Sequence, residues 1–162
     1  MFSFFHNHIV IPVVPVEVNN RVFGIEISYI KELIVKKEFF VVPKVPDFTV
    51  GFINLRGEVV PCFDLQNILF GTKRKFDGDV IDFAVMLRVS GKSLGFVVDK
   101  VMKVMYIDET NLKGYIEDIW KDVKFVKYFI EVSNSLMAVI DVESVLKYID
   151  KVNKEFYKYV RR

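Results

Sequence analysis

Apolar and polar residues alternate with a period of two along most of the chain, a pattern typical of half-buried β-strands. Short polar groups such as Asn19-Asn20, Ser90-Gly91-Lys92 and Ser133-Asn134-Ser135 separate the alternating runs and suit tight hairpin turns. The pattern therefore predicts a mainly β protein. The expected strands are Ile9 to Val18, Arg21 to Ile27, Thr49 to Leu55, Val59 to Phe63, Ile81 to Val89, Ser93 to Val98, Phe125 to Val132 and Leu136 to Ile140.

Three segments between the expected strands have helical features. Apolar residues in Ser28 to Ile34 predict a short helix, and Asp64 can cap a second short helix that ends at Gly71. From Glu143 to Val160, apolar residues recur at steps of three and four positions and form one stripe. This last helix is expected to pack against the rest of the protein.

The sequence contains an internal repeat. The segment Gly24 to Ile34 matches Gly95 to Met105 at every apolar position, and Val59 to Asp64 resembles Leu136 to Asp141. Either a duplication or strand periodicity alone accounts for these matches. Many short strands joined by tight turns favour barrels, because closure removes exposed sheet edges. We therefore expect two small barrels side by side, with a binding groove between them.

Composition narrows the class of protein. The 162 residues are 52% hydrophobic and 15% aromatic, so the chain can bury a large core. A net charge of +2 is too small to indicate a nucleic-acid or membrane partner. No apolar run reaches the ~20 residues of a membrane span, and the amino terminus lacks the basic region of a signal peptide. The single cysteine, Cys62, favours a reducing compartment such as the cytoplasm.

No catalytic, metal or cofactor site is expected from the sequence. Cys62 lies in an expected strand without a histidine nearby in the sequence, and no glycine-rich phosphate loop occurs. The group Asp77, Asp79 and Asp82 lacks the glycine and the closing glutamate of a calcium loop. His6 and His8 have no further cysteine or histidine with which to complete a zinc site.

One segment resembles a known family. Val42 to Leu65, and above all Asn54-Leu55-Arg56-Gly57 followed by Pro61 and Asp64, is similar to the signature of the CheW family. Phe23 to Ile27 and Leu94 to Val101 stand where that family has its equivalent blocks, so the resemblance covers roughly Val16 to Leu146. The chain departs from the family in its turns at Asn19-Asn20 and Ser133-Asn134, and Asn111 to Lys124 matches no pattern of the family.

The resemblance implies one CheW-like domain over residues 1–162 with two five-stranded SH3-like barrels packed together. The first barrel is expected at about 9–72, the second at about 80–141 and the carboxy-terminal helix at about 143–160. The implied function is that of a non-enzymatic chemotaxis adaptor that couples chemoreceptor tips to the regulatory domain of the histidine kinase CheA. It implies a cytoplasmic protein that reaches membrane-bound receptor arrays through protein contacts, without membrane insertion.

The resemblance also implies a receptor-binding surface, against which a receptor helical hairpin would lie. An arginine in the signature loop can grip a carboxylate, beside an apolar groove. Three apolar candidates, Ile27, Val98 and Val101, suit a core equally well, and Arg56 and Asp99 also suit purely structural turns. Asp64 and Asp141 are interpreted as helix caps, and kinase-binding residues are not assigned. The receptor-binding candidates are Ile27, Ile30, Glu32, Leu33, Asn54, Leu55, Arg56, Gly57, Val98, Asp99 and Val101.

The alternative is a β-barrel protein that binds nucleic acid. It would use basic residues together with aromatic stacking platforms. The same cations also suit a solvated loop and a helix carboxy terminus, so the resemblance outweighs this alternative. The basic residues concerned are Lys73, Arg74, Lys75, Lys158, Arg161 and Arg162.

Overall fold

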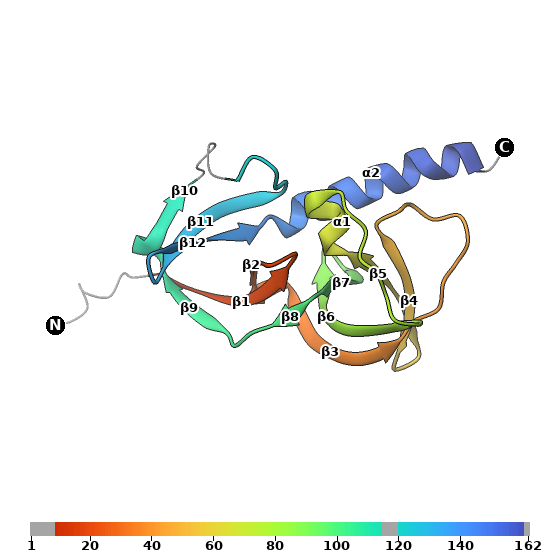
Figure 1. Cartoon of the computed structure of the whole chain (residues 1–162), viewed down its shortest axis with the longest axis horizontal. Coiled ribbons are helices and arrows are strands. Elements are labelled where there is room, and N and C mark those ends of the chain that lie inside the picture. The colour runs from red at the N-terminus through yellow and green to blue at the C-terminus, as the bar shows by residue number, and fades with distance from the viewer. Residues whose placement is uncertain (1–8, 115–119, 161–162) are drawn as a thin grey trace.

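A computed structural model describes residues 9–114 and 120–160 as two curled β-sheets side by side, with one long helix along the second (Figure 1). We call the two sheets barrel A and barrel B. This arrangement confirms the mainly β fold with a carboxy-terminal helix that the sequence predicts.

Barrel A is built from both ends of the chain. Its strand order is β10-β11-β12-β2-β1-β8, and β9 also pairs with β1. The strands are β1 (Val10–Val18), β2 (Arg21–Glu26), β8 (Lys100–Val101), β9 (Met105–Asp108), β10 (Leu112–Gly114), β11 (Val126–Val132) and β12 (Ser135–Ile140), and η3 (Glu109–Asn111) is a single turn between β9 and β10.

Barrel B is built from the middle of the chain, with the strand order β3-β6-β7-β5-β4. An isolated bridge between Phe40 and Phe52 joins the chain just after β3 to β4, so the two outer strands of this sheet meet. The elements are η2 (Ile27–Tyr29), β3 (Ile30–Glu38), β4 (Thr49–Leu55), β5 (Glu58–Asp64), α1 (Leu65–Phe70), β6 (Val80–Val89) and β7 (Lys92–Val98).

The expected barrel boundaries, 9–72 and 80–141, are wrong. β1 and β2 do not join the strands that follow them. β1 pairs instead with β8 and β9, and β2 pairs in parallel with β12 through Ala138 opposite Phe23. Strand alternation specifies which residues face the core but not which strand becomes the neighbour. The amino-terminal hairpin therefore completes a barrel whose other strands come from the end of the chain.

The helix expected over Ser28 to Ile34 is also wrong. A single 3-10 turn, η2, is followed at Ile30 by strand β3, which pairs with β6. The β-branched residues of this segment suit a strand, and pairing along the whole of β6 outweighs a weak helical spacing. Beyond β3, the strands β8, β9 and β10 were also absent from the sequence prediction.

The other two helices are confirmed together with their caps. The Asp64 carboxylate accepts a hydrogen bond from the Gln66 amide at 3.0 Å, and α1 ends at Gly71 in a left-handed conformation with φ of 80°. The Asp141 carboxylate accepts from the Ser144 amide at 3.1 Å at the start of α2 (Val142–Val160). Both aspartates are thus structural residues of helix starts.

The internal repeat corresponds to one strand arrangement that occurs twice. Cys62 on β5 lies opposite Gly95 on β7, and Val139 on β12 lies opposite Gly24 on β2, in two parallel pairs. Each glycine permits close approach: a Cβ at Gly24 would lie 2.5 Å from a Val13 methyl carbon. Barrels A and B therefore have the same order of equivalent strands. Each barrel nevertheless combines a strand from the first copy of the repeat (β2 or β5) with a strand from the second copy (β12 or β7).

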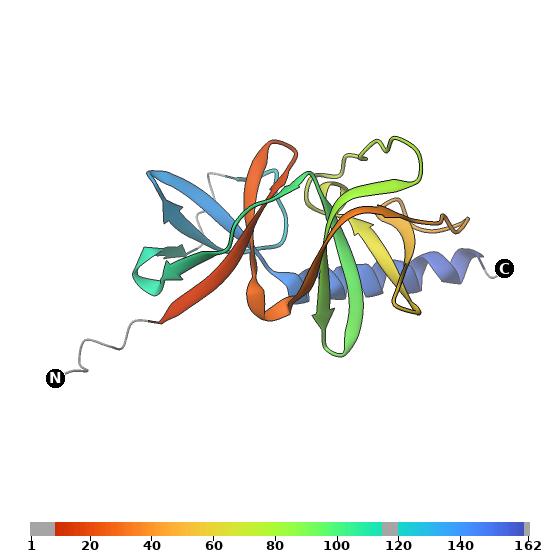
Figure 2. The same cartoon turned by 90° about the horizontal axis from the view of Figure 1, so that it is seen from below.

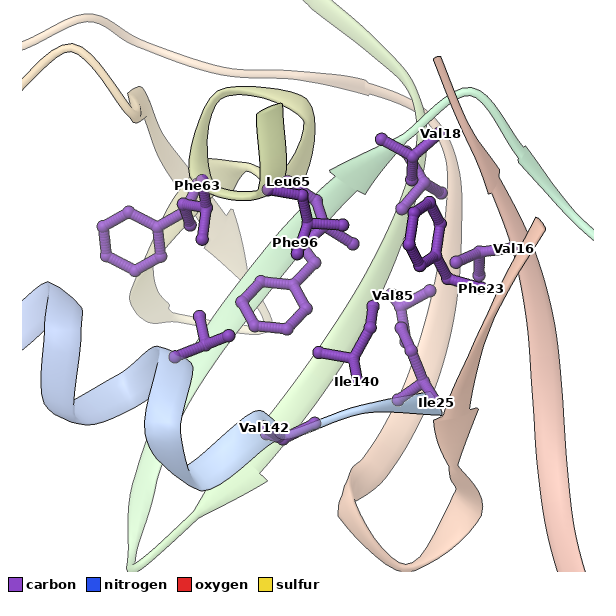
Figure 3. Packing of buried hydrophobic residues seen from close by; sticks show 14 of the residues in the cluster. Val16, Val18, Phe23, Ile25, Phe63, Leu65, Val85, Phe96, Ile140 and Val142 are labelled. Atoms are coloured by element: carbon purple, nitrogen blue, oxygen red, sulfur yellow. The ribbon is translucent and has the colours of Figure 1, made fainter. Parts of the chain in front are cut away.

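A shared hydrophobic core joins the two barrels, as Figure 3 shows. Strand β6 belongs to two cores at once, because Val85 and Leu87 face this shared core while Ala84 and Met86 face the interior of barrel B. Phe23 from barrel A and Phe96 from barrel B are both fully buried in the shared core. Burial on both faces of the central strands fixes the barrels relative to each other.

We expect Phe96→Ala to lower the free energy of unfolding by about 3–5 kcal/mol, since it leaves a cavity in the shared core. The single tryptophan, Trp120, packs against Phe23 in barrel A and reports on that barrel by fluorescence. The single cysteine, Cys62, lies inside barrel B, where burial raises the thiol pKa to about 12, and reports by thiol reactivity during denaturation.

Both probes are expected to give the same denaturant midpoint, in the wild-type protein and in Phe96→Ala. Val59→Ala, at a side chain that is 57% exposed, is the control and should change the free energy of unfolding by about 0.5 kcal/mol or less. Two separate midpoints for Trp120 and Cys62 would contradict a shared core that couples the barrels.

Candidate protein-binding site

Six of the receptor-binding candidates meet at one end of barrel B. Glu32 and Leu33 lie on β3, while the tetrapeptide from Asn54 to Gly57 forms the β4–β5 hairpin turn. These two segments are far apart in the strand order, and the closure of the barrel brings them together. We call this group the B mouth; its members are Glu32, Leu33, Asn54, Leu55, Arg56 and Gly57.

An ion pair spans the B mouth. Arg56 donates from Nη1 to Oε2 of Glu32 at 3.3 Å, and from Nη2 to Oε1 of the same carboxylate. This two-point geometry suits the planar guanidinium group. The hydrogen bond to Glu32, followed by its negative charge, raises the pKa of Arg56 above its ordinary value. Arg56 is 71% exposed while Glu32 is 27% exposed, so the arginine presents the pair to solvent.

The hairpin turn holds Arg56 in an unusual backbone conformation. Both turn residues have positive φ, 52° at Arg56 and 85° at Gly57, as in a type I′ turn. The Asn54 side chain stabilises the turn by accepting a hydrogen bond from the Gly57 amide at 2.9 Å. Asparagine or glycine is the usual residue at the position of Arg56, because a positive φ is unfavourable for other side chains. The Arg56 side chain is exposed, so its burial does not offset this unfavourable backbone conformation.

Exposed apolar side chains surround the B mouth. Leu33 is 47% exposed on the outer face of β3, and Val35 follows on the same face at 62%. Val59, next to the hairpin turn, is 57% exposed. Val35 and Val59 were not among the sequence candidates. Strand alternation around Val60, whose side chain points inward, was the signal that could have identified Val59.

The remaining candidates lie where the chain crosses between the barrels. Ile27 and Ile30 belong to the crossing from β2 to β3, where Ile27 is 39% exposed and Ile30 packs partly against the shared core. Val98, Asp99 and Val101 belong to the return crossing from β7 to β8.

The two crossings lie at opposite edges of the interface between the barrels, as Figure 2 shows. Ile30 pairs with Leu87 and Val98 with Phe83, four residues apart along β6, which corresponds to about 13 Å. The sequence candidates therefore do not form one continuous surface.

Val98 is a core residue. Its side chain is 1% exposed and belongs to the shared core, and Val101 packs partly against the same core. The sequence allowed Val98 to be either a receptor contact or a core residue, and the structure shows that it is a core residue. Direct contact between a partner and this side chain is excluded in this conformation.

Asp99 takes part in a buried ionic network centred on Arg74. The Asp99 carboxylate accepts hydrogen bonds from Nη1 of Arg74 and from the Asn19 amide at 2.8 Å. Arg74 also bonds to the buried Asp64, through its backbone amide at 2.9 Å and its Nε at 3.4 Å. The network ties α1 and the loop before β6 to the turn between β1 and β2. Asp99 is therefore primarily a structural residue between the barrels.

The same network argues against nucleic-acid binding, because it occupies Arg74. The Arg74 side chain is only 12% exposed and already paired with two carboxylates, so it cannot reach a phosphate. Lys73 forms a salt bridge with Asp47 at 3.5 Å, and Lys158 lies at the far end of α2. Arg161 and Arg162 fall outside the described residues. The cations assembled for this alternative do not form one surface in the described part of the chain.

Within residues 9–114 and 120–160, no group of three histidine, cysteine, aspartate or glutamate side chains could hold a metal ion. His6 and His8 lie outside these residues. No described helix is both long and apolar enough to cross a membrane.

Comparison with known proteins gives a consistent result. The family model of the CheW-like domain matches residues 12–150. The chemotaxis protein CheW of Thermotoga maritima is 28% identical over 134 residues, which cover 82% of this chain and 85% of that protein. The chemotaxis protein CheW of Bacillus subtilis is 25% identical over 130 residues, 80% of this chain and 82% of that protein.

A crystal structure of the scaffolding protein TtCheW from Thermoanaerobacter tengcongensis has the same fold. It superposes with a TM-score of 0.70 and covers 82% of this chain and 89% of its own, at 22% sequence identity. The matched region includes both barrels, since residues 12–150 extend from β1 into α2.

We expect Arg74→Met to lower the free energy of unfolding by about 3 kcal/mol, because it leaves Asp64 buried without its cation. Lys73→Met is the matched control. It removes a neighbouring lysine that is 66% exposed and should cost about 0.5 kcal/mol or less in chemical denaturation. Asp64→Asn in the Arg74→Met background should recover part of the loss. Equal effects of the arginine and lysine substitutions would show that the network does not join the barrels.

Proposed function

This chain belongs to the family of CheW-like chemotaxis scaffolds, and we propose that it couples chemoreceptor tips to the histidine kinase CheA as a non-catalytic adaptor. The family model and the relatives in Thermotoga maritima and Bacillus subtilis support the chemotactic role. The partners, the contact residues and the absence of catalysis are the proposal. They imply a cytoplasmic protein that reaches membrane-bound arrays by binding other proteins.

The main structural support for the proposal is the geometry of the B mouth. It presents an arginine and a glutamate in a two-point ion pair, with Leu33 exposed on the outer face of the same strand as the glutamate. The ion pair is held by strand and hairpin backbone, so its position is fixed before a partner arrives. Such preorganisation lowers the entropy that binding would otherwise cost. An arginine whose side chain is 71% exposed, in a turn residue with positive φ, is better explained by binding than by stability.

The chemistry of this surface suits a helical hairpin with carboxylates on its flank. Leu33 and Val35 offer an apolar strip to the apolar face of a helix, while Arg56 can exchange one bond to Glu32 for a bond to a partner carboxylate. Ile27 is 39% exposed and extends the apolar strip toward the crossing between the barrels. We propose Ile27, Leu33 and Arg56 as direct contacts of the receptor.

The other candidates act by positioning in this proposal. Glu32 orients Arg56, while Asn54 and Gly57 set the turn. Ile30 and Leu55 are half-buried and support the surface from below, while Val98, Asp99 and Val101 belong to the return crossing and hold the barrels together. Kinase-binding residues remain unassigned, because nothing in the family signature separates them from the rest of the surface.

We expect Arg56→Glu to weaken binding of a receptor-tip fragment about tenfold or more, since it places two carboxylates side by side where the partner requires a cation. Calorimetric titration of the purified chain with that fragment and with a CheA regulatory domain measures the effect. Arg88→Glu reverses another exposed arginine, on β6, and serves as the matched control. Unchanged receptor binding by a folded Arg56→Glu protein would refute the contact.

The charge-swapped double variant Glu32→Arg with Arg56→Glu separates the two roles of the arginine. It restores an ion pair across the B mouth but presents a carboxylate where the arginine was. Failure of the swap to restore receptor binding is expected if Arg56 contacts the partner. Full recovery would assign the pair to maintaining the shape of the turn.

A further inference from the structure

The mouth of barrel A, equivalent to the B mouth by the internal repeat, contains an apolar pocket of about 400 Å³. Three methionines line it, Met102 and Met105 from the segment around β9 and Met137 from β12. The other apolar lining residues come from the β1–β2 hairpin, Pro15 and Val22, and from the β11–β12 hairpin, Val132 and Leu136. Lys103 stands at the rim of the pocket. We call this pocket the A mouth.

The A mouth and the B mouth lie at opposite ends of the molecule. The β11–β12 hairpin and β9 lie at the end of barrel A, and the β4–β5 hairpin lies at the far end of barrel B (Figures 1 and 2). A molecule bound at one mouth therefore leaves the other accessible.

The internal repeat relates the two mouths residue by residue. Because Gly24 to Ile34 matches Gly95 to Met105, Lys103 occupies the position of Glu32. Both hairpins have two-residue turns, so Ser133 occupies the position of Arg56. The ion pair that spans the B mouth is thus replaced by a lone cation and a serine.

Lys103 differs from the Arg56–Glu32 pair in its charge partners. Among the described residues it forms no salt bridge, and its side chain is exposed at the edge of the apolar pocket. In the B mouth the cation and the anion satisfy each other within one chain. In the A mouth no carboxylate of the described residues forms a salt bridge with Lys103, so a partner carboxylate can take that place.

We propose that the A mouth is a docking site for a segment of a partner protein that inserts one large apolar side chain between the methionines and sets a carboxylate against Lys103. Methionine side chains are flexible and polarisable, and they adapt to apolar side chains of different shape. Met102 and Met105 are only half-buried, so the pocket is accessible from solvent. This site is independent of the receptor contacts proposed for the B mouth.

The test uses the full chain labelled with ¹³C at the methionine methyl groups. The probes are four acetylated and amidated alanine hexapeptides, each with one phenylalanine and one glutamate separated by one to four positions. We expect at least one of them to shift the Met102, Met105 and Met137 methyl signals saturably at concentrations up to about 5 mM. Met86, which is buried in barrel B, is the internal control and should not respond.

Charge substitutions test the role of Lys103. A peptide with glutamine in place of glutamate should bind about threefold more weakly, as expected for an exposed ion pair. Lys103→Glu should abolish this preference, while Lys100→Glu, at an exposed lysine outside the pocket, should keep it. No saturable shift with any of the four peptides, an equal response at Met86, or a glutamate preference that survives Lys103→Glu would overturn the proposal.

Discussion

The structure depends on one core that both barrels share. The central strands β6 and β7 bury side chains on both faces, so barrel B cannot separate from barrel A without exposing Phe96 and Val85 to water. Helix α2 strengthens this dependence, because it follows β12, the last strand of barrel A, and buries Val145 and Ile149 in the shared core. The arrangement makes two small barrels, each of marginal size alone, into one stable unit.

This constraint also explains how the candidate surfaces are presented. The chain crosses between the barrels twice, and the ionic network of Arg74 with Asp64 and Asp99 braces the return crossing. With the crossings fixed, the hairpin turns at the far ends of the two barrels are held at a constant separation. A scaffold that arranges other proteins requires this property, since binding at a rigid surface positions the partner as well as holding it.

The internal repeat gives the two barrel mouths equivalent backbone positions, but the side chains at these positions differ. At the B mouth, Arg56 and Glu32 neutralise each other on a closed rim. At the A mouth, Ser133 and Lys103 occupy the equivalent sequence positions, and Lys103 lines an apolar pocket. The same backbone therefore supports two surfaces with different charge, as the proposed adaptor function requires if two partners are to bind without competing.

The sequence alone determined the β class, the two capped helices and the family, because strand alternation, helix caps and the Asn54 to Gly57 signature are local features. It could not determine strand partners, so the helix expected at Ser28 to Ile34 became strand β3 once β6 was available to pair with it. Tertiary structure alone placed Val98 in the core, buried Arg74 between two carboxylates and brought Glu32 to Arg56. Each of these outcomes depends on contacts between residues distant in the chain, and barrel closure and shared burial decide such contacts.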